Sequence, residues 1–278
     1  MAHRSALINV MAGAARKAAR GLNHDFGEVE QLQVSRKGPA DFVSTADRRA
    51  ERVLIEELKR ARPRYGVLSE ERGAQAGADT SNRWIVDPLD GTLNFLHGNP
   101  HFCLSLALER DGEIFAGAVY DPLRDELFWA EKGAGAYLND RRLRVSARQQ
   151  LREAVLATGI RFMGEPERPR FLARLEAMMA LSGGFRRFGA AALDLAYVAA
   201  GRYDGFWEAG LEPWDIAAGI LLVSEAGGFV STLDGGAEML ESGDVVAANP
   251  HLHPLILSVL GEVGAGEPGP AERLGAKA

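Results

Sequence analysis

An apolar run that ends in two carboxylates constrains the fold of this chain more than any other feature. The run belongs to WIVDPLDGTLNF, residues 84–95, and the acids are Asp87 and Asp90. The apolar part is typical of a buried strand. Pro88 keeps Asp87 extended, and Gly91 allows a tight turn directly after the acids. The sequence therefore predicts a strand at whose end two acids lie close together.

Strand patterns continue after this motif, and helical patterns precede it. Residues 102–122 predict a hairpin with its turn at Asp111-Gly112, and two more strands extend to about residue 140. Helical spacing predicts helices at residues 4–22 and from Thr45 to Pro63. A short polar strand near residues 29–34 and a loop at residues 36–41 are expected between these helices.

The second half of the chain alternates between the two kinds of pattern. Helices are predicted at residues 168–181, 190–201 and 215–226, the last closed by Gly227-Gly228. Strands are predicted at AVLATG (154–159), DGFWE (204–208), GFVST (228–232) and DVVAAN (244–249). Without strict βαβ alternation, these elements predict an α+β fold, a layered sandwich. We divide it into an N-terminal portion (1–145), a C-terminal portion (146–265) and a flexible tail (266–278).

Composition excludes several classes of protein. Of the residues, 46% are hydrophobic and 25% charged, as in ordinary soluble proteins, and the net charge of −6 argues against direct nucleic-acid binding. The single cysteine, Cys103, excludes an internal disulfide and is expected to be a buried, inert thiol. No apolar run is long enough for a membrane span, and the first helix is amphipathic, unlike a signal peptide. A cytoplasmic protein is expected.

The two acids favour a site for divalent cations. Thr92 opens a predicted short helix whose backbone N–H groups suit phosphate oxygens. Asp87 and Asp90 alone would repel a phosphate, and divalent cations between them reverse the sign of that interaction. Ligands that offer only oxygen suit Mg²⁺ or Mn²⁺.

Other acids stand at comparable places, and each has a structural alternative. Glu70 and Glu71 follow an apolar stretch at a predicted strand end, but a solvated loop explains them equally well. Asp47 and Asp215 lie in the first turns of helices, where capping alone accounts for an aspartate. Turn formation does not account for both acids of DPLDGT.

The remaining polar residues carry weaker signals. His97 and His101 are separated by Gly98 and Pro100, so no helix aligns them for zinc, and surface or structural roles are expected. The sequence leaves the roles of three further residues open: Glu212, Arg186 and Arg187.

Four segments in order resemble the signature segments of the inositol monophosphatase family, which are Mg²⁺-dependent, lithium-sensitive phosphomonoesterases. The segments are DFVSTAD (41–47), LSEE (68–71), WIVDPLDGTLNF (84–95) and WDIAAGILLVSEAGG (214–228). The resemblance extends from the first helix to about residue 260. It implies a layered αβαβα sandwich, a homodimer, and two to three Mg²⁺ ions, with Mn²⁺ as an alternative.

The resemblance also implies roles for individual residues. The implied metal ligands are Glu70, Asp87, the carbonyl of Leu89, Asp90 and Asp215. Thr92, Asp47 and Glu70 are the implied catalytic residues, Thr92 and Asp47 acting on the attacking water. The implied substrate contacts are Asp90, Gly91, Thr92, Ala191, Glu208 and Asp215. Lys37 and Asp41 lie in an implied mobile loop, with Arg36 competing for the position of Lys37.

The function implied is hydrolysis of myo-inositol monophosphate by metal-activated water. Two alternatives stay open. In the first, the enzyme hydrolyses a different small phosphate ester: histidinol phosphate, fructose 1,6-bisphosphate or a 3′-phosphoadenosine nucleotide. Otherwise the chain is a regulatory binding protein of the transcription machinery, in which phosphatase activity is incidental.

Overall fold

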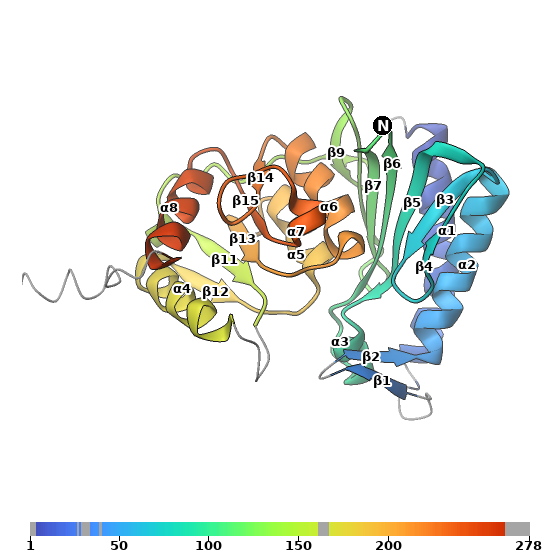
Figure 1. Ribbon diagram of the computed structural model, residues 1–278, viewed down its shortest axis with the longest axis horizontal. Coiled ribbons are helices and arrows are strands. Elements are labelled where there is room, and N and C mark those ends of the chain that lie inside the picture. Colours follow the sequence, from blue (N-terminus) through green and yellow to red (C-terminus); the bar gives the residue numbers. More distant parts are fainter. Residues whose placement is uncertain (1–3, 27, 29–33, 39–40, 161–166, 265–278) are drawn as a thin grey trace, which may run out of the picture.

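Five layers of alternating helices and strands make up the molecule, as Figure 1 shows. The structure is a computed structural model, and it describes residues 4–26, 28, 34–38, 41–160 and 167–264. Side chains within residues 34–38 and 41–44 and at Gly264 are outside this description. Within the described ranges, no helix combines the length and apolar character needed to cross a membrane.

Two long helices form the first layer. Helix α1 (Ala6–Phe26) packs along α2 (Thr45–Ala61), and both cover one face of the larger sheet. Their apolar residues recur at helical spacing, so each helix buries one face. Ile8 and Met11 of α1 and Leu54 of α2 are completely buried there.

The larger sheet is the second layer and has eight strands in the order β10-β9-β8-β7-β6-β5-β3-β4. The strands are β3 (Tyr65–Ser69), β4 (Gly73–Gln75), β5 (Asp79–Asp90), β6 (Cys103–Arg110), β7 (Glu113–Asp121), β8 (Glu126–Glu131), β9 (Gly135–Leu138) and β10 (Arg141–Arg142). Neighbours are antiparallel except for β3 and β5, which run parallel. Strand β5 is therefore internal and carries the apolar run to the edge where the acids lie.

A register shift between β5 and β6 positions the two acids. Asp87 pairs with Ser105 and Asp90 with Cys103, so β5 contains one more residue than β6 over this interval. Pro88 lies within it and has no N–H group to donate to the ladder, which explains why the regular pairing fails here. Such a bulge redirects side chains at the end of a strand.

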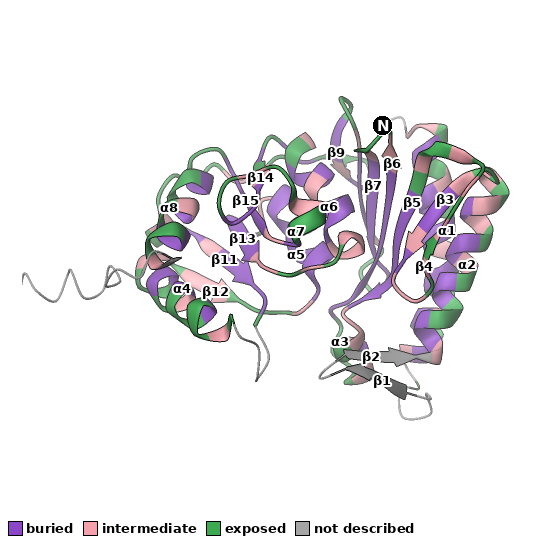
Figure 2. Cartoon of the chain, in the orientation of Figure 1, coloured by how far each residue is buried: buried purple, intermediate pink, exposed green. Residues whose placement is uncertain are grey.

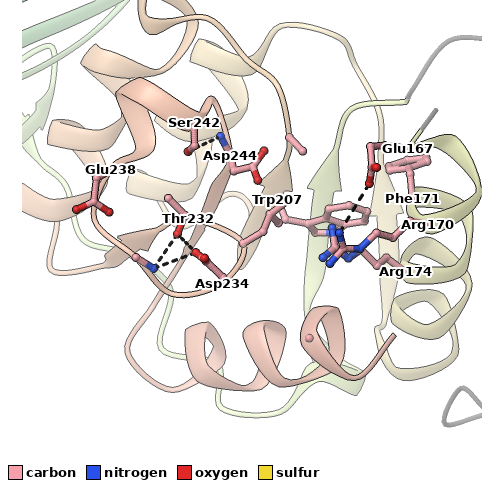
Figure 3. A pocket seen from close by; sticks show the side chains of 14 residues that line it. Glu167, Arg170, Phe171, Arg174, Trp207, Thr232, Asp234, Glu238, Ser242 and Asp244 are labelled. Carbon is pink, nitrogen blue, oxygen red and sulfur yellow. Dashed lines mark hydrogen bonds and ion pairs between the residues drawn. The ribbon is translucent and has the colours of Figure 1, made fainter. Parts of the chain in front are cut away.

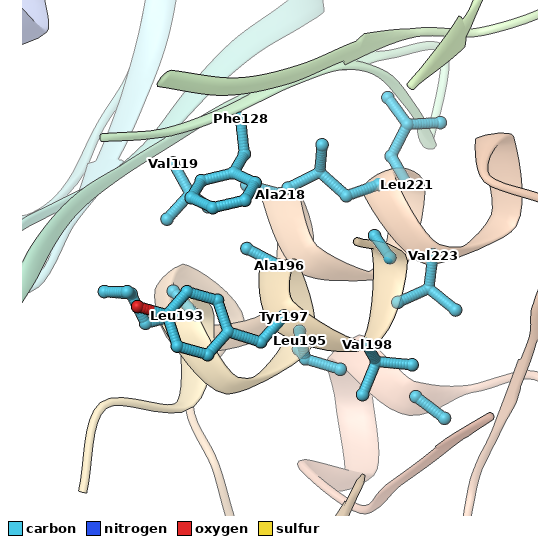
Figure 4. Close-up of a cluster of buried hydrophobic side chains, with 14 of the residues drawn as sticks. Val119, Phe128, Leu193, Leu195, Ala196, Tyr197, Val198, Ala218, Leu221 and Val223 are labelled. Atoms are coloured by element: carbon cyan, nitrogen blue, oxygen red, sulfur yellow. The ribbon is translucent and has the colours of Figure 1, made fainter. Parts of the chain in front are cut away.

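Helices α5 (Ala191–Ala199) and α6 (Pro213–Glu225) form the middle layer between the two sheets. They are apolar nearly all round, as expected for helices covered on both sides. Figure 4 shows Val119 and Phe128 of the larger sheet facing Leu193, Tyr197 and Ala218 of these helices. Figure 2 shows buried residues on both sides of this layer.

The smaller sheet and two outer helices complete the sandwich. Five strands lie in the order β12-β11-β13-β15-β14, namely β11 (Val155–Thr158), β12 (Gly184–Arg186), β13 (Gly205–Glu208), β14 (Phe229–Ser231) and β15 (Val245–Ala248). Helices α4 (Arg168–Leu181) and α8 (Leu252–Gly264) pack together on its outer face. The smaller elements are β1 (Val34–Gly38), β2 (Asp41–Ser44), α3 (Thr92–Leu96), η2 (Leu151–Glu153) and α7 (Met239–Ser242).

The layered αβαβα sandwich predicted from the sequence is confirmed, and several local predictions are corrected. The loop expected at residues 36–41 is wrong in part, because residues up to Gly38 and from Asp41 onward belong to the β1–β2 hairpin. Helices α7 and α8 and strand β12 were not predicted. Except for Val34, the strand expected at 29–34 lies outside the described residues, as does the tail at 266–278. The division at residue 145 stays a prediction.

Strand β7 and helix α6 approach so closely that only glycine fits at position 117. A Cβ added to Gly117 lies 3.0 Å from the Cα and the carbonyl oxygen of Ala218. We expect Gly117→Ala to lower the free energy of unfolding by about 1–3 kcal/mol, because the sheet and the helix must separate. Denaturant unfolding measures this change.

The matched control is the same substitution at an open position. Gly13 lies on the exposed face of α1 with nothing within 4 Å of its added Cβ. Gly13→Ala is expected to raise the free energy of unfolding by about 0.5–1 kcal/mol, since alanine favours the helix. Equal effects at both positions would contradict the close approach.

Candidate active site

The carboxylates of Asp87 and Asp90 are oriented by hydrogen bonds from the backbone. Asp87 Oδ1 accepts the N–H of Leu89 at 2.8 Å, within its own turn. Asp90 Oδ2 accepts the N–H of Ala192, in the first turn of α5, at 2.8 Å. Both side chains are buried. The second of these bonds ties the end of the larger sheet to the middle helical layer.

Glu70 follows β3, the parallel neighbour of β5, so both strands deliver acids to the same edge. Its N–H donates to the carbonyl of Val86 at 3.2 Å. The next two N–H groups, of Glu71 and Arg72, donate to the buried carboxylate of Glu51 at 3.1 and 3.2 Å. Glu51 of α2 thus fixes the turn that carries Glu70.

Asp215 lies in the first turn of α6 and is the third acidic segment at this edge, after Glu70 and the pair Asp87 and Asp90. Its Oδ2 accepts the N–H of Glu212 at 2.9 Å, and the two residues form a reciprocal capping box. Pro213 occupies the first turn of the helix, where a missing N–H costs nothing. The capping role that the sequence offered as an alternative is therefore present, and it also answers what Glu212 does.

The pKa values show that these carboxylates converge. Burial, followed by the charges of Glu70, Asp90 and Asp215, raises the pKa of Asp87 well above its usual value. Burial is also the first cause that raises the pKa of Asp90 to about 7, and Glu70 and Glu208 add to it. The pKa of Asp215 rises to about 7, first through burial and then through Asp90. Like charges shift one another only at short range, so the segments at residues 70, 87–90 and 215 meet.

This donor set fits hard divalent cations. It consists of carboxylate oxygens, and the nearby thiol of Cys103 has a pKa raised well above its usual value by burial and by Asp90, so it stays protonated. In the described part of the chain, no three His, Cys, Asp or Glu side chains are already arranged as a metal cluster. Backbone hydrogen bonds set the orientations of Asp87, Asp90 and Asp215.

Thr92 and Asp47 lie next to the acids. The Thr92 hydroxyl is 3.0 Å from Asp47 Oδ1 and 3.0 Å from the carbonyl oxygen of Leu89. Asp47 is completely buried in the first turn of α2. Since a hydroxyl has one hydrogen, Thr92 donates to one of these oxygens at a time and keeps lone pairs for a third partner. The sequence placed these residues in different helices, and the structure brings them together.

The implied substrate contacts lie around the same edge. Gly91 precedes α3 in the left-handed conformation, with φ of 94°, and α3 begins at Thr92. Ala191 is the first residue of α5 and Glu208 the last residue of β13. The charge of Glu208 acts on Asp90, which places its carboxylate toward the acids. Strands β1 and β2 contain Lys37 and Asp41, whose side chains lie outside the described residues, so their roles stay predictions.

Sequence reasoning missed three residues that support the site. Asn94 donates its side-chain N–H to the carbonyls of His101 at 2.8 Å and Phe188 at 2.6 Å, which joins α3 to the C-terminal portion. Glu51 and Cys103 are the others, the latter with Sγ 3.7 Å from Asp90 Oδ2. The buried position expected for Cys103 is confirmed, but the thiol contacts the site. Cys103 lies opposite Asp90 because of the register shift between β5 and β6, which no sequence signal indicated.

The histidines and arginines that the sequence left aside are structural or peripheral. His101 is buried, and burial lowers its pKa to about 4, so it is neutral near pH 7. Its ring stacks on Phe188. His97, Arg186 and Arg187 are exposed, and the structure gives the two arginines no assigned role.

Comparison with known proteins identifies the family. The model of the inositol monophosphatase family matches residues 3–265. The chain belongs to the inositol monophosphatase family. It is 58% identical over 257 residues to an inositol-1-monophosphatase of Mesorhizobium japonicum, covering 92% of this chain and 97% of that protein. The enzyme class predicted from the sequence, a phosphoric monoester hydrolase, is confirmed by this membership.

Other members carry a different name. A Nus factor SuhB of Vibrio cholerae is 42% identical over 258 residues, which are 93% of this chain and 97% of that protein. The crystal structure of an extragenic suppressor protein, suhB, from Bartonella henselae superposes with a TM-score of 0.90. The two sequences are 54% identical, and the superposition covers 92% of the present chain and 98% of the crystallised chain. Enzymes of the family generally depend on metal.

The raised pKa values predict that Mg²⁺ binding releases protons. Without the ion, Asp90 and Asp215 have folded pKa values of about 7 against an ordinary 3.8, so both hold protons at pH near 5.5. The two protonated aspartates add to the free energy of unfolding of the metal-free protein. This contribution is fully present below about pH 4 and is lost as the pH rises to about 7. Because a cation requires both to be ionised, we expect proton release at about pH 5.5.

Calorimetric titration of Mg²⁺ in buffers of different ionisation enthalpy measures these protons. Release is expected to disappear at about pH 8.5, where the aspartates are already ionised in the free enzyme. A binding enthalpy independent of the buffer at the lower pH would show that these carboxylates are not involved.

Proposed function

We propose that this protein is a Mg²⁺-dependent phosphomonoesterase that hydrolyses myo-inositol monophosphate to inositol and phosphate. The observation that carries the proposal is the group of buried carboxylates Asp87, Asp90 and Asp215, whose pKa values are raised by burial and by neighbouring acids, beside the Thr92–Asp47 pair. The similarity to an inositol-1-monophosphatase over nearly the whole chain supports the choice of substrate.

Two to three Mg²⁺ ions, with Mn²⁺ as an alternative, are proposed to bind at this edge of the larger sheet. The proposed ligands are Glu70, Asp87, the carbonyl of Leu89, Asp90 and Asp215. When bound, such ions supply positive charge for the phosphate and lower the pKa of water. The rigid strand β5 and the helix start at α6 suit this role, because they fix the ligands from separate elements.

Thr92 and Asp47 are proposed to orient the attacking water and to take up its proton. The Thr92 hydroxyl oxygen accepts a hydrogen bond from the water, and the hydroxyl donates its own hydrogen to Asp47 Oδ1, with the two oxygens 3.0 Å apart. The buried carboxylate of Asp47 then receives the proton through the hydroxyl. The N–H groups of Gly91 and Thr92 are proposed to hold the phosphate oxygens at the start of α3.

The alcohol part of the substrate is proposed to lie against Ala191 and Glu208. A carboxylate accepts hydrogen bonds from neighbouring hydroxyl groups, which a polyhydroxylated ring supplies. A Cβ added to Gly159 lies 1.7 Å from Glu208 Oε1, so Gly159 provides the space in which this carboxylate rests. The position of Glu208 therefore depends on that glycine.

A phosphate-release screen tests the substrate. The candidates are myo-inositol 1-phosphate, histidinol phosphate, fructose 1,6-bisphosphate and adenosine 3′,5′-bisphosphate. We expect kcat/KM to be at least about tenfold higher for the inositol ester, and Glu208→Gln to reduce that preference. Equal or higher kcat/KM for another ester would overturn the substrate assignment while leaving the reaction class intact.

A second function is favoured by the similarity to relatives named Nus factor SuhB. In this alternative the chain binds a protein of the transcription machinery, and hydrolysis is incidental. The Asp90→Asn variant separates the two functions, since binding by another surface does not require the acids. A pull-down with this variant is expected to recover a transcription protein, and an empty pull-down would dismiss the alternative.

A homodimer is also proposed, on the ground of family membership alone. Sedimentation equilibrium measures the mass of the particle. A mass near twice the 30.0 kDa of one chain is expected, and a single-chain mass at micromolar concentration would contradict it.

A further inference from the structure

A cavity of about 590 Å³ lies against the outer face of the smaller sheet. Helix α4, the end of β13 and the segment from Thr232 to Asp244 line it, and none of the proposed active-site residues does. Strand β13 lies between this cavity and the proposed active site. Its Trp207 belongs to the outer hydrophobic cluster and lines this cavity, whereas the next residue, Glu208, acts on Asp90. The volume is that of a small-molecule site.

A largely buried arginine, Arg174, lines this cavity. Arg174 is 8% exposed, and its Nε donates to the carbonyl of Leu260 at 3.1 Å. In the described part of the chain, no carboxylate lies within 4.0 Å of its guanidinium. Burial, followed by the charge of Arg170, lowers the pKa of Arg174, and the charges of Asp244 and Glu167 oppose this. Buried charges are normally paired, so the geometry calls for an anion.

The neighbouring arginine, Arg170, differs from Arg174 because it has an ion-paired carboxylate. Arg170 lies 3.8 Å from Glu167, and both side chains are half exposed. Its charge is therefore compensated and hydrated, whereas Arg174 has no ion pair with any of the described residues.

The opposite end of the cavity is acidic. Figure 3 shows Asp234, Glu238 and Asp244 on one side, the two arginines on the other, and Trp207 between them. Asp234 accepts hydrogen bonds from the hydroxyl of Thr232 and from the N–H of Gly236, which hold it in place. The cavity is thus polarised, with one cationic end, one acidic end and an aromatic wall between them.

We propose that this cavity binds a small zwitterion. Its carboxylate pairs with Arg174, its ammonium group lies toward Asp234, Glu238 and Asp244, and its aliphatic part packs on Trp207. The ring of Phe171, whose centroid is 5.3 Å from that of Trp207, extends this wall. A simple anion meets repulsion at the acidic end, and a simple cation meets it at Arg174. The proposal does not depend on the phosphatase substrate.

Nuclear magnetic resonance tests the proposal with three matched probes. 4-Aminobutyrate is the zwitterion, butyrate lacks the ammonium group, and butylamine lacks the carboxylate. The chain has four tryptophans, so the indole signal of Trp207 is readily assigned with a Trp207→Phe variant. We expect 4-aminobutyrate to shift this signal saturably, with at least about tenfold weaker binding of either single-charge probe. Equal binding of butyrate, or no saturable shift, would overturn the proposal.

Variants locate the two charged ends. Arg174→Gln is expected to weaken 4-aminobutyrate binding at least about tenfold, and Asp244→Asn to weaken it less while leaving butyrate binding equal or tighter. Retained phosphate release shows that each variant folds, and Asp244→Asn keeps the test decisive if Arg174→Gln does not. Asp90→Asn serves as the control and is expected to leave 4-aminobutyrate binding unchanged. Unchanged binding in both cavity variants would place the probe elsewhere.

Discussion

Replacing Asp90 with asparagine is expected to abolish nearly all Mg²⁺-dependent phosphate release while making the metal-free protein more stable. Asparagine keeps an oxygen that accepts the N–H of Ala192, so the local fold is retained. It removes a negative charge that the proposed cations require. We expect kcat/KM to fall by a factor of about 1,000 or more, as for loss of a metal ligand that also holds the substrate.

The opposite sign of the stability change makes this variant informative. In the metal-free protein above about pH 7, Asp90 is ionised next to Glu70 and buried, which is why its pKa is raised to about 7. Removal of that charge is expected to raise the free energy of unfolding by about 1–3 kcal/mol at pH near 8. Asp140→Asn is the control for turnover, because Asp140 is exposed and its ion pair is with Arg4, 3.6 Å away, so phosphate release should stay unchanged. Unchanged turnover in Asp90→Asn would contradict the proposed role of the acids.

Replacing Thr92 with valine is expected to reduce kcat by about 100- to 10,000-fold with little change in KM. Valine has nearly the same shape and lacks the hydroxyl that lies 3.0 Å from Asp47 Oδ1. Proton uptake from the attacking water is thereby interrupted, while the N–H groups at the start of α3 remain. The buried carboxylate of Asp47 also loses a donor, so we expect a lower free energy of unfolding, by about 1–3 kcal/mol.

Thr92→Ser separates the chemical role of Thr92 from its structural one. Serine keeps the hydroxyl and is expected to retain kcat within about tenfold of the parent enzyme. Steady-state kinetics with myo-inositol 1-phosphate gives kcat and KM for both variants. If valine and serine at position 92 lowered kcat equally, the hydroxyl would have no part in the reaction.

Much of the fold could be predicted from the sequence because its elements are strongly patterned. The hairpin of β6 and β7 alternates around a clear turn, and α4 was placed at its observed residues, 168–181. Helix α8 (Leu252–Gly264) was missed although Asn249, whose side-chain oxygen accepts the N–H of Leu252 at 2.9 Å, marks its start. The β1–β2 hairpin was read as a loop, since Gly38 and Pro39 mask short polar strands.

The sequence predicted the acidic residues of the site, but not the hydrogen bonds that hold them in position. Four acids were singled out by their positions at strand and helix ends, which the sequence displays directly. The bond from the N–H of Ala192 to Asp90 joins residues 102 positions apart, and no local pattern announces a backbone donor. Glu51 likewise looks like an ordinary helix glutamate, and its role depends on the turn that follows β3. Such supports depend on tertiary packing and could not be read from local spacing.

A crystal structure of the enzyme with Mn²⁺, measured at the manganese absorption edge, tests the central claim most directly. The claim is that Glu70, Asp87, Asp90 and Asp215 share divalent cations. Our account predicts at least two anomalous peaks between these carboxylates, with manganese–oxygen distances of about 2.2 Å. At saturating Mn²⁺, anomalous density confined to other parts of the molecule would contradict it.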